Sequence, residues 1–179
     1  DESEPLAGLL RKCLLLGAET GSDSLRQWAR YELNGYEEGV ELPSYRMLPA
    51  PTLMVDSFSG PNRTTGQAFD RLQLPPKARE CVPEKMPFHQ PIEELQKLAE
   101  QKTLSFTGPG LGFAVKRWND VLDWRQQVTG MHFELSGSVI TGILGQIRTQ
   151  LVVMVADLTA ETPLAELPGK AAVDAAVEQ

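Results

Sequence analysis

Cysteine and histidine are scarce in this chain of 179 residues, with two of each. A secreted disulfide scaffold needs several paired cysteines, and a structural zinc site needs four Cys or His ligands at short spacings. The spacing of Cys13 and Cys81 suggests no bridge, and no Cys-x-x-Cys accompanies His89 or His132. We therefore expect free thiols, no metal, no cofactor and a cytoplasmic location.

Positive charge and long apolar runs are also in short supply. The chain has 17 Lys and Arg against 24 Asp and Glu, a net charge of −7. Proteins that coat nucleic acid use a net positive field, so this balance argues against nucleic acid as a partner, while leaving room for a local basic patch. The longest uninterrupted apolar run, residues 151–156, is far shorter than the ~18 residues that span a bilayer. We therefore expect no membrane contact.

Helical periodicity is strongest at the two ends of the chain. Apolar residues at helical spacing follow Pro5, and a second run follows the N-cap signal Ser22-Asp23-Ser24 and stops at Asn34-Gly35. The short link between the two runs predicts an antiparallel hairpin. A third pattern, over residues 138–161, keeps one apolar face for about five turns and stops at Thr162-Pro163.

The middle of the chain is mixed. Extended segments are expected over residues 45–58, 104–107 and 131–135, a turn at 59–62, and helices after Pro91 and over 113–124, while residues 64–74 fit strand and helix equally. The fold class is therefore α+β: an N-terminal antiparallel helical hairpin, a small mixed strand and loop middle, and a long C-terminal amphipathic helix. We expect one domain over residues 1–163. Residues 164–179 then form an Ala-rich tail or the start of a linker to a further C-terminal part.

No segment carries a complete catalytic motif. The Gly-rich segment 108–112 lacks the sixth-position Gly of a dinucleotide fingerprint and the Gly-Lys-Ser/Thr of a P-loop, so it predicts a tight turn. Metal-dependent nucleases often set an acid on one strand against Glu-x-Lys on the next, so that carboxylates hold a metal and the lysine polarises water. Asp56, Glu100 and Lys102 fit that pattern loosely, although Glu100 and Lys102 are expected at a helix end.

Aromatic and charged side chains gather near the predicted hairpin: Trp28, Glu32, Tyr36, Tyr45 and Arg46. Trp28 and Glu32 are four residues apart and share a helix face, and an acidic loop after Tyr36 can return Tyr45 and Arg46 to that face. We predict Glu32 and Arg46 within hydrogen-bonding reach, as a charge-assisted clasp. The alternative is a ligand or partner surface, because Trp, Tyr and Arg are favoured at interfaces.

The same stretch resembles a known family. Leu14-Leu15-Leu16, Leu25-Arg26-Gln27-Trp28, Glu32-Leu33-Asn34-Gly35-Tyr36 and Leu42-Pro43-Ser44-Tyr45-Arg46 together resemble the AbiTii domain of bacterial abortive-infection and other anti-phage loci. The helix predicted over 138–161, with Gly142, Ile147 and Arg148, is similar to the closing helix of that family. The resemblance implies one such domain over roughly the whole chain, usually an N-terminal accessory module of a longer protein. It brings a defence context and no catalytic residues.

The predicted long helix also suggests assembly. Gly142 and Gly145 are poor helix formers, so their expected use is the close approach of another backbone. Together with Arg148 they mark a candidate oligomer face, and the apolar face of this helix is wider than one hairpin covers. We therefore expect self-association, most simply as a two-fold dimer.

The leading functional hypothesis is a non-enzymatic interaction or sensor module of an anti-phage defence system. It would bind a protein partner, itself or a phage-derived trigger, and pass that event to an effector. Two alternatives stay open. One is the metal-dependent nuclease toxin, and the other is an acidic partner that neutralises a basic toxin through Glu37, Glu38 and Glu41.

Overall fold

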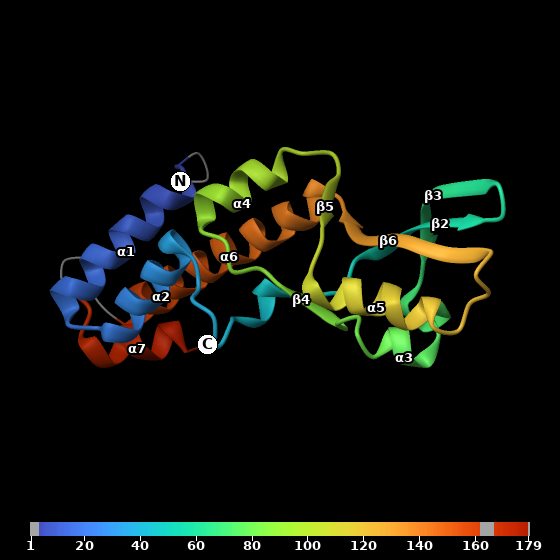
Figure 1. The fold of residues 1–179 in the computed structure, drawn as a ribbon. Coiled ribbons are helices and arrows are strands. Elements are labelled where there is room, and N and C mark those ends of the chain that lie inside the picture. The colour runs from blue at the N-terminus through green and yellow to red at the C-terminus, as the bar shows by residue number, and fades with distance from the viewer. Residues whose placement is uncertain (1–3, 162–166, 179) are drawn as a thin grey trace. The chain divides into compact units, whose positions relative to one another are not determined.

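The chain packs as two compact units that alternate along the sequence. The computed structural model describes residues 4–161 and 167–178. Unit 1 comprises Asp1–Arg46, His89–Glu100 and Ser138–Gln179, and unit 2 comprises Met47–Phe88 and Gln101–Gly137. Helices build unit 1, and antiparallel strands with covering helices build unit 2 (Figure 1), so the predicted α+β class is confirmed.

Unit 1 begins with the predicted hairpin. Helix α1 (Leu6–Thr20) starts directly after Pro5 and ends at Gly21, which adopts a left-handed φ of 72°. Helix α2 (Asp23–Asn34) begins at the N-cap Ser22, whose Oγ accepts a hydrogen bond of 3.2 Å from the backbone N–H of Leu25. A polar N-cap and a C-terminal glycine satisfy backbone groups that a helix end leaves open, which is why the sequence marked these limits well.

Three further helices complete unit 1: α4 (Ile92–Ala99), α6 (Gly137–Glu161), which lies in this unit from Ser138 onward, and α7 (Lys170–Val177). The long helix α6 buries one stripe at helical spacing: Ile140, Ile143, Ile147, Leu151 and Met154. Side chains from α1, α2, α6 and α7 line one apolar cavity of about 30 Å³. These four helices therefore share a core, with α6 running along its length (Figure 1).

Helix α7 corrects the sequence-based description of the C-terminal segment. Residues 170–177 were expected in an Ala-rich tail or linker, yet they form a helix that packs against α2 and buries Val173 and Ala176. Small alanine side chains gave little periodic signal, although they allow close packing. The predicted boundary at residue 163 stays a prediction, and residues 162–166 lie outside the described residues.

Helix α6 is also long and apolar enough to cross a membrane. Within the segment Gly137–Thr159, an 18-residue window has a mean hydropathy of 1.5, and 28% of that window is buried in this structure. Scattered polar residues such as Gln146 and Arg148 break it into short runs, which is why no long apolar run stands out in the sequence. Length and composition alone carry this finding, since the core helix of a soluble protein can pass the same test. The absence of membrane contact stays a prediction.

Unit 2 is organised around an antiparallel sheet of order β3-β2-β6-β5. Its strands are β2 (Thr52–Ser59), β3 (Asn62–Phe69), β5 (Leu104–Phe106) and β6 (Gln126–Leu135), and a separate pair joins β1 (Met47–Pro49) to β4 (Lys85–Pro87). Leu53 lies opposite Phe133 and Val55 opposite Met131, so alternate residues of both strands share one face. That face is buried.

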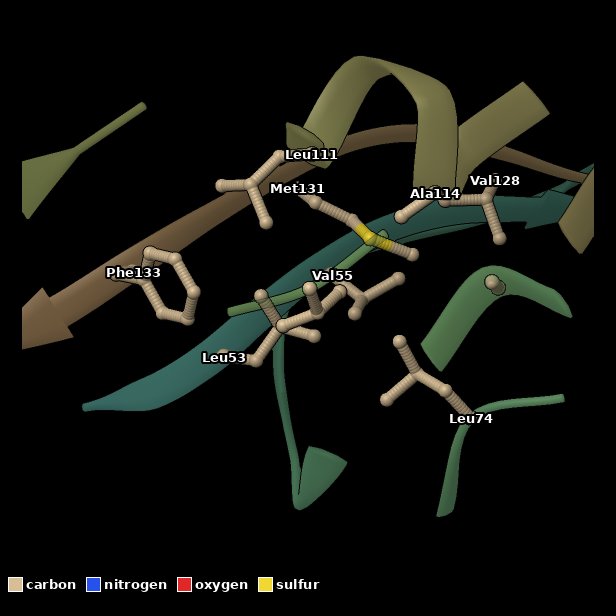
Figure 2. Packing of buried hydrophobic residues seen from close by; sticks show 10 residues of the cluster. Leu53, Val55, Leu74, Leu111, Ala114, Val128, Met131 and Phe133 are labelled. Carbon is tan, nitrogen blue, oxygen red and sulfur yellow. The ribbon is translucent and has the colours of Figure 1, made fainter. Parts of the chain in front are cut away.

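The core of unit 2 lies between this sheet face and two helices, α3 (Pro76–Arg79) and α5 (Pro109–Asn119). Figure 2 shows Leu111 and Ala114 of α5 beside Leu53, Val55 and Met131 of the strands. Leu74 approaches the same cluster from the segment before α3.

Three sequence-based limits shift in unit 2. The helix predicted over 113–124 runs instead from Pro109 to Asn119, because proline suits a first helical turn. The side chain of Asn119 then binds the backbone of Val128, with Nδ2 donating to the carbonyl at 2.9 Å and Oδ1 accepting from the N–H at 2.8 Å. The strand predicted over 131–135 begins earlier, at Gln126. Residues 64–74, which fitted strand and helix equally, form most of β3 and a short 3-10 helix, Arg71–Gln73.

Candidate functional site

A buried ion pair joins α2 to the segment that follows the acidic loop. Glu32 and Arg46 are each 0% exposed. Arg46 donates from Nη2 to Glu32 Oε2 at 2.6 Å and from Nε to both carboxylate oxygens at 3.2 Å. The predicted contact between these two residues is therefore confirmed. Planar guanidinium and carboxylate groups match in this two-pronged geometry, which makes the pair stronger and more directional than a neutral hydrogen bond.

Three aromatic residues complete the polar network around Glu32. The hydroxyls of Tyr36 and Tyr45 donate to Glu32 Oε1 at 2.8 and 2.9 Å. Trp28 Nε1 donates to the Tyr45 hydroxyl at 2.9 Å, and the guanidinium of Arg46 lies 4.9 Å from the centre of the Tyr36 ring. All five clasp residues predicted from the sequence are thus brought together.

The network also holds the chain that leads into α4. Arg46 Nη1 donates to the backbone carbonyl of Gln90 at 2.8 Å, and the N–H of Tyr36 donates to the carbonyl of His89 at 2.9 Å. Gly35, which precedes Tyr36, has a φ of 90°. A Cβ built on Gly35 would lie 2.8 Å from the carbonyl oxygen of His89. A side chain at this position would meet both backbone strain and a steric clash. The clasp therefore joins α2, the segment at Tyr45 and Arg46, and the chain that leads into α4.

Burial and the carboxylate set the ionisation of the two tyrosines. Desolvation raises the pKa of Tyr36 and of Tyr45 well above the usual tyrosine value, and the negative charge of Glu32 raises both pKa values further. Both hydroxyls therefore stay protonated and remain hydrogen-bond donors to Glu32 throughout the physiological range. The network is a fixed set of donors around one buried carboxylate, an arrangement suited to holding the fold rather than to exchanging protons with a substrate.

A polar groove beside the clasp was not predicted. It has a volume of about 610 Å³, and its lining includes Arg26, Arg30, Tyr31 and Asn34 of α2. The ring of Tyr31 stacks on that of Tyr36 with centroids 5.1 Å apart, which connects the groove wall to the buried network. Arg26 and Asn34 belong to the sequence motifs described above, but no sequence signal predicts a groove here, because exposed Arg and Asn on a helix are ordinary surface residues.

The candidate oligomer face lies on the exposed side of α6. Apart from the backbone of α6 itself, no described atom lies within 4 Å of a Cβ built on Gly142 or Gly145, so the close approach of another backbone at these glycines stays a prediction. Gly145, Arg148, Val152 and other residues of α6 line an apolar groove of about 410 Å³, to which α1 contributes Leu9. Arg148 Nη2 donates to the backbone carbonyl of Glu4 at 3.2 Å, which links α6 to the start of α1.

The residues of the nuclease hypothesis have ordinary roles. Asp56 lies in β2, where Oδ1 accepts a hydrogen bond of 2.7 Å from the N–H of Gly66. Glu100 is the exposed C-cap of α4, and Lys102 is exposed in the segment before β5. Over residues 4–161 and 167–178, no three His, Cys, Asp or Glu residues are grouped so as to hold a metal ion.

The acidic loop is free to meet solvent. Glu37, Glu38 and Glu41 are all exposed, and Glu37 also lines the polar groove.

Both cysteines are unpaired, as predicted, and both are partly buried. Cys13 lies in the apolar packing of α1, where burial raises the pKa of its thiol to about 11.

Comparisons with known proteins point to one family. Neither the curated proteins nor the solved structures gave a match. A family model described as AbiTii matches residues 1–178, and this range includes the clasp, both units and the long helix α6. The chain therefore belongs to the AbiTii family, whose name associates it with abortive-infection defence against phage.

Proposed function

We propose that this AbiTii protein is a non-enzymatic interaction module that pairs with a second copy through the exposed face of α6. In this proposal the pairing, or a change in it when a phage-derived trigger binds, is passed to an effector. The clasp holds α2 and the segment before α4 in place, and α6 supplies the contact. The observation that carries the proposal is the residue composition of the exposed side of α6.

That exposed side carries a regular seam. Gly142, Gly145, Thr149, Val152 and Ala156 recur at spacings of three and four residues, and all are exposed. Spacing of this kind keeps one stripe facing a partner helix, as in coiled coils. Small residues let two helix axes approach to about 8 Å, at the close end of the range for packed helices.

The two glycines of the seam also cost stability, and no side chain of the described residues packs against them to offset it. Each glycine inside a helix costs about 1 kcal/mol relative to alanine. Val152 is 63% exposed and Val155 57% exposed, beside the apolar groove that Gly145 lines. A second α6 laid along the seam would cover these valines and make use of both glycines, which favours a two-fold dimer.

Light scattering on the purified chain tests this proposal. We expect a dimer at high micromolar concentration, and a monomer for Val152→Glu, which places a charge in the seam. Gly145→Leu should also give a monomer while the free chain keeps its thermal stability, because leucine favours helix and the space around Gly145 is open.

A matched control comes from unit 2. Leu72 is 71% exposed, so Leu72→Glu adds the same charge at a similarly open position of the other unit. This variant should remain dimeric. A wild-type chain that is monomeric over the whole concentration range would contradict the proposal, and so would a dimer that survives both α6 variants.

A further inference from the structure

Charge is divided very unevenly between the two units. Unit 1 contains 8 Lys and Arg against 17 Asp and Glu, a net charge of −9, whereas unit 2 contains 9 against 7, a net charge of +2. Together these give the −7 of the whole chain. The net negative charge that disfavours nucleic acid as a partner therefore belongs to unit 1 and not to unit 2. Electrostatic attraction depends on the local field, which falls off within roughly 10 Å at moderate salt.

Three of the nine cations of unit 2 lie with an exposed tryptophan where α5 leads into β6. Lys116 and Arg117 are exposed at the end of α5, and Trp124 and Arg125 follow in the turn before β6. The β2–β3 turn lies against the same place, because the N–H of Gly60 donates to the carbonyl of Arg125 at 2.8 Å.

The β2–β3 hairpin carries one more cation at this end of the sheet, on the face opposite the one that α5 covers. Arg63 pairs with Phe58, and Phe58 pairs on its other side with Gln127, two residues after Arg125. We call Arg63, Lys116, Arg117, Trp124 and Arg125 the basic tip. Figure 1 shows the β2–β3 turn and the start of β6 at the same end of the sheet.

Trp124 is the least protected aromatic feature of the tip. It is 75% exposed, and the guanidinium of Arg125 lies 5.0 Å from the centre of its ring. Phe113, 64% exposed, lies one helical turn before Lys116 and Arg117 on the same exposed side of α5. A large indole left in water contributes little to folding, whereas a π-face beside guanidinium groups is the combination on which unpaired bases stack.

Two carboxylates lie among these cations. Asp120 approaches Arg117 at 3.8 Å, and Asp123 Oδ1 accepts a hydrogen bond of 2.9 Å from the backbone N–H of Arg125. Asp123 is therefore engaged with the backbone of the turn and helps to present Trp124 and Arg125. With four cations against two carboxylates, the tip keeps a net positive charge.

We propose that the basic tip of unit 2 binds single-stranded nucleic acid, with Trp124 stacking on a base and Arg63, Lys116, Arg117 and Arg125 meeting phosphates. A single strand is favoured over a duplex because only unpaired bases offer their faces to an aromatic ring. It is favoured over an acidic protein because charge alone would not require the exposed indole. The inference concerns unit 2 and stands whether or not α6 pairs with a second copy.

Fluorescence anisotropy with the full chain and a labelled oligothymidine or oligouridine of about 20 nucleotides, longer than a usual single-strand site, tests this proposal. A duplex of the same length and a polyglutamate are the competing probes. We expect the single strand to bind most tightly. The logarithm of its affinity should fall linearly with the logarithm of the salt concentration, at about 0.7 per phosphate contact for about three to four contacts.

The variants separate stacking from charge. Trp124→Ala should weaken single-strand binding at least about fivefold and leave the salt slope unchanged, as expected for a lost stack. Arg125→Gln and Arg117→Gln should each lower the slope by about 0.7. Lys85→Gln removes an exposed cation of the same unit outside the tip and should change neither quantity.

Three outcomes would overturn the proposal. The first is that the single strand does not bind at about 50 mM salt, where charge contacts are strong. The second is that polyglutamate binds as tightly as the oligonucleotide. The third is that Trp124→Ala leaves single-strand binding unchanged. Circular dichroism of each variant shows whether the fold survives. If Trp124→Ala does not fold, Trp124→Leu provides the same loss of stacking with an apolar side chain.

Discussion

Glu32 and Arg46 each carry a full charge into the core of unit 1, where neither could remain alone. Taking an ion out of water costs several kcal/mol, and the attraction between the two offsets this only when the geometry is good and the remaining polar atoms are paired. Here the two tyrosine hydroxyls and the Gln90 carbonyl provide the remaining partners. The pair therefore acts as a device for fixing which segments meet, more than as a source of net stability.

Removing one charge should expose this dependence. We expect Glu32→Gln to lower the free energy of unfolding by about 3–5 kcal/mol, because it leaves the buried guanidinium without its counter-charge. Urea unfolding measures the change. The double variant Glu32→Leu with Arg46→Met should lose clearly less than the sum of the two single changes, since no unpaired charge remains. Simple additivity would contradict the clasp.

The tyrosines make the stability of the same network sensitive to high pH. Folding raises the pKa of Tyr36 and Tyr45, so the folded chain keeps protons that the unfolded chain releases near the usual value of 10.0. Their contribution is fully present below pH 10.0 and is lost as the pH rises above it. Thermal melts from neutral to alkaline pH should show a steep fall in wild type and a shallower one in Tyr36→Phe. Identical alkaline slopes in both chains would rule out this linkage.

Helix α7 is an element held by hydrogen bonds as well as by apolar contacts. Asp174 Oδ1 accepts from the hydroxyls of Ser22 at 2.5 Å and Ser24 at 2.6 Å, and these two bonds lower the pKa of its carboxyl group below the usual aspartate value of 3.8. Ser22 at the same time caps α2. One serine therefore joins the start of the second helix to the last helix described.

Asp174→Ala should loosen α7 without disturbing α2. We expect faster hydrogen exchange over residues 170–177 and unchanged protection in α2, because the Ser22 cap to Leu25 survives. In wild type the same loosening should develop as the pH falls below 3.8, since a lowered pKa gives stability that is lost on protonation. Glu178→Ala, at an exposed position of the same segment, is the matched control. Loss of protection in α2 as well would show that the two helices unfold together.

Elements with strong end signals could be predicted from the sequence, and elements without them could not. The limits of α2 followed from Ser22 and Gly35, which perform chemical tasks at the helix ends. Strand β3 was ambiguous because almost all of its residues are exposed, so no alternation of apolar and polar residues marks it.

The candidate site divides in the same way. Contact between Glu32 and Arg46 could be inferred from two features of the sequence. Trp28 and Glu32 are four residues apart and so share a helix face, and the loop after Tyr36 can return Arg46 to that face. The division into two units could not, because it depends on which distant segments pack together, and unit 1 is drawn from three separate stretches. The residues that line the polar groove lie between positions 14 and 37, and four of the five residues of the basic tip lie between positions 116 and 125, yet in the sequence they look like ordinary surface residues.

At the scale of the whole molecule, Glu100 separates an interaction module from a nuclease. It is exposed at the end of α4, so Glu100→Ala should change the free energy of unfolding by about 0.5 kcal/mol or less and leave a phage-defence phenotype intact. Plaque assays and urea unfolding measure the two effects. Cleavage of DNA or RNA by the purified chain that depends on a divalent metal ion and is lost in Glu100→Ala would support the nuclease hypothesis instead. Loss of a metal-binding carboxylate removes such activity while the fold survives.

The alternation of the two units along the chain sets an order of folding during synthesis. All strands and covering helices of unit 2 have been made once Gly137 has left the ribosome, whereas the core of unit 1 still lacks α6 and α7. Until then Leu10 and Leu25, both buried in the finished fold, have no long helix to cover them. Contacts between such distant segments form late, because a long loop must close first. Helices α1 and α2, which are made before unit 2, are therefore completed after it, and a nascent chain halted before α6 would carry a finished unit 2 and an open hairpin.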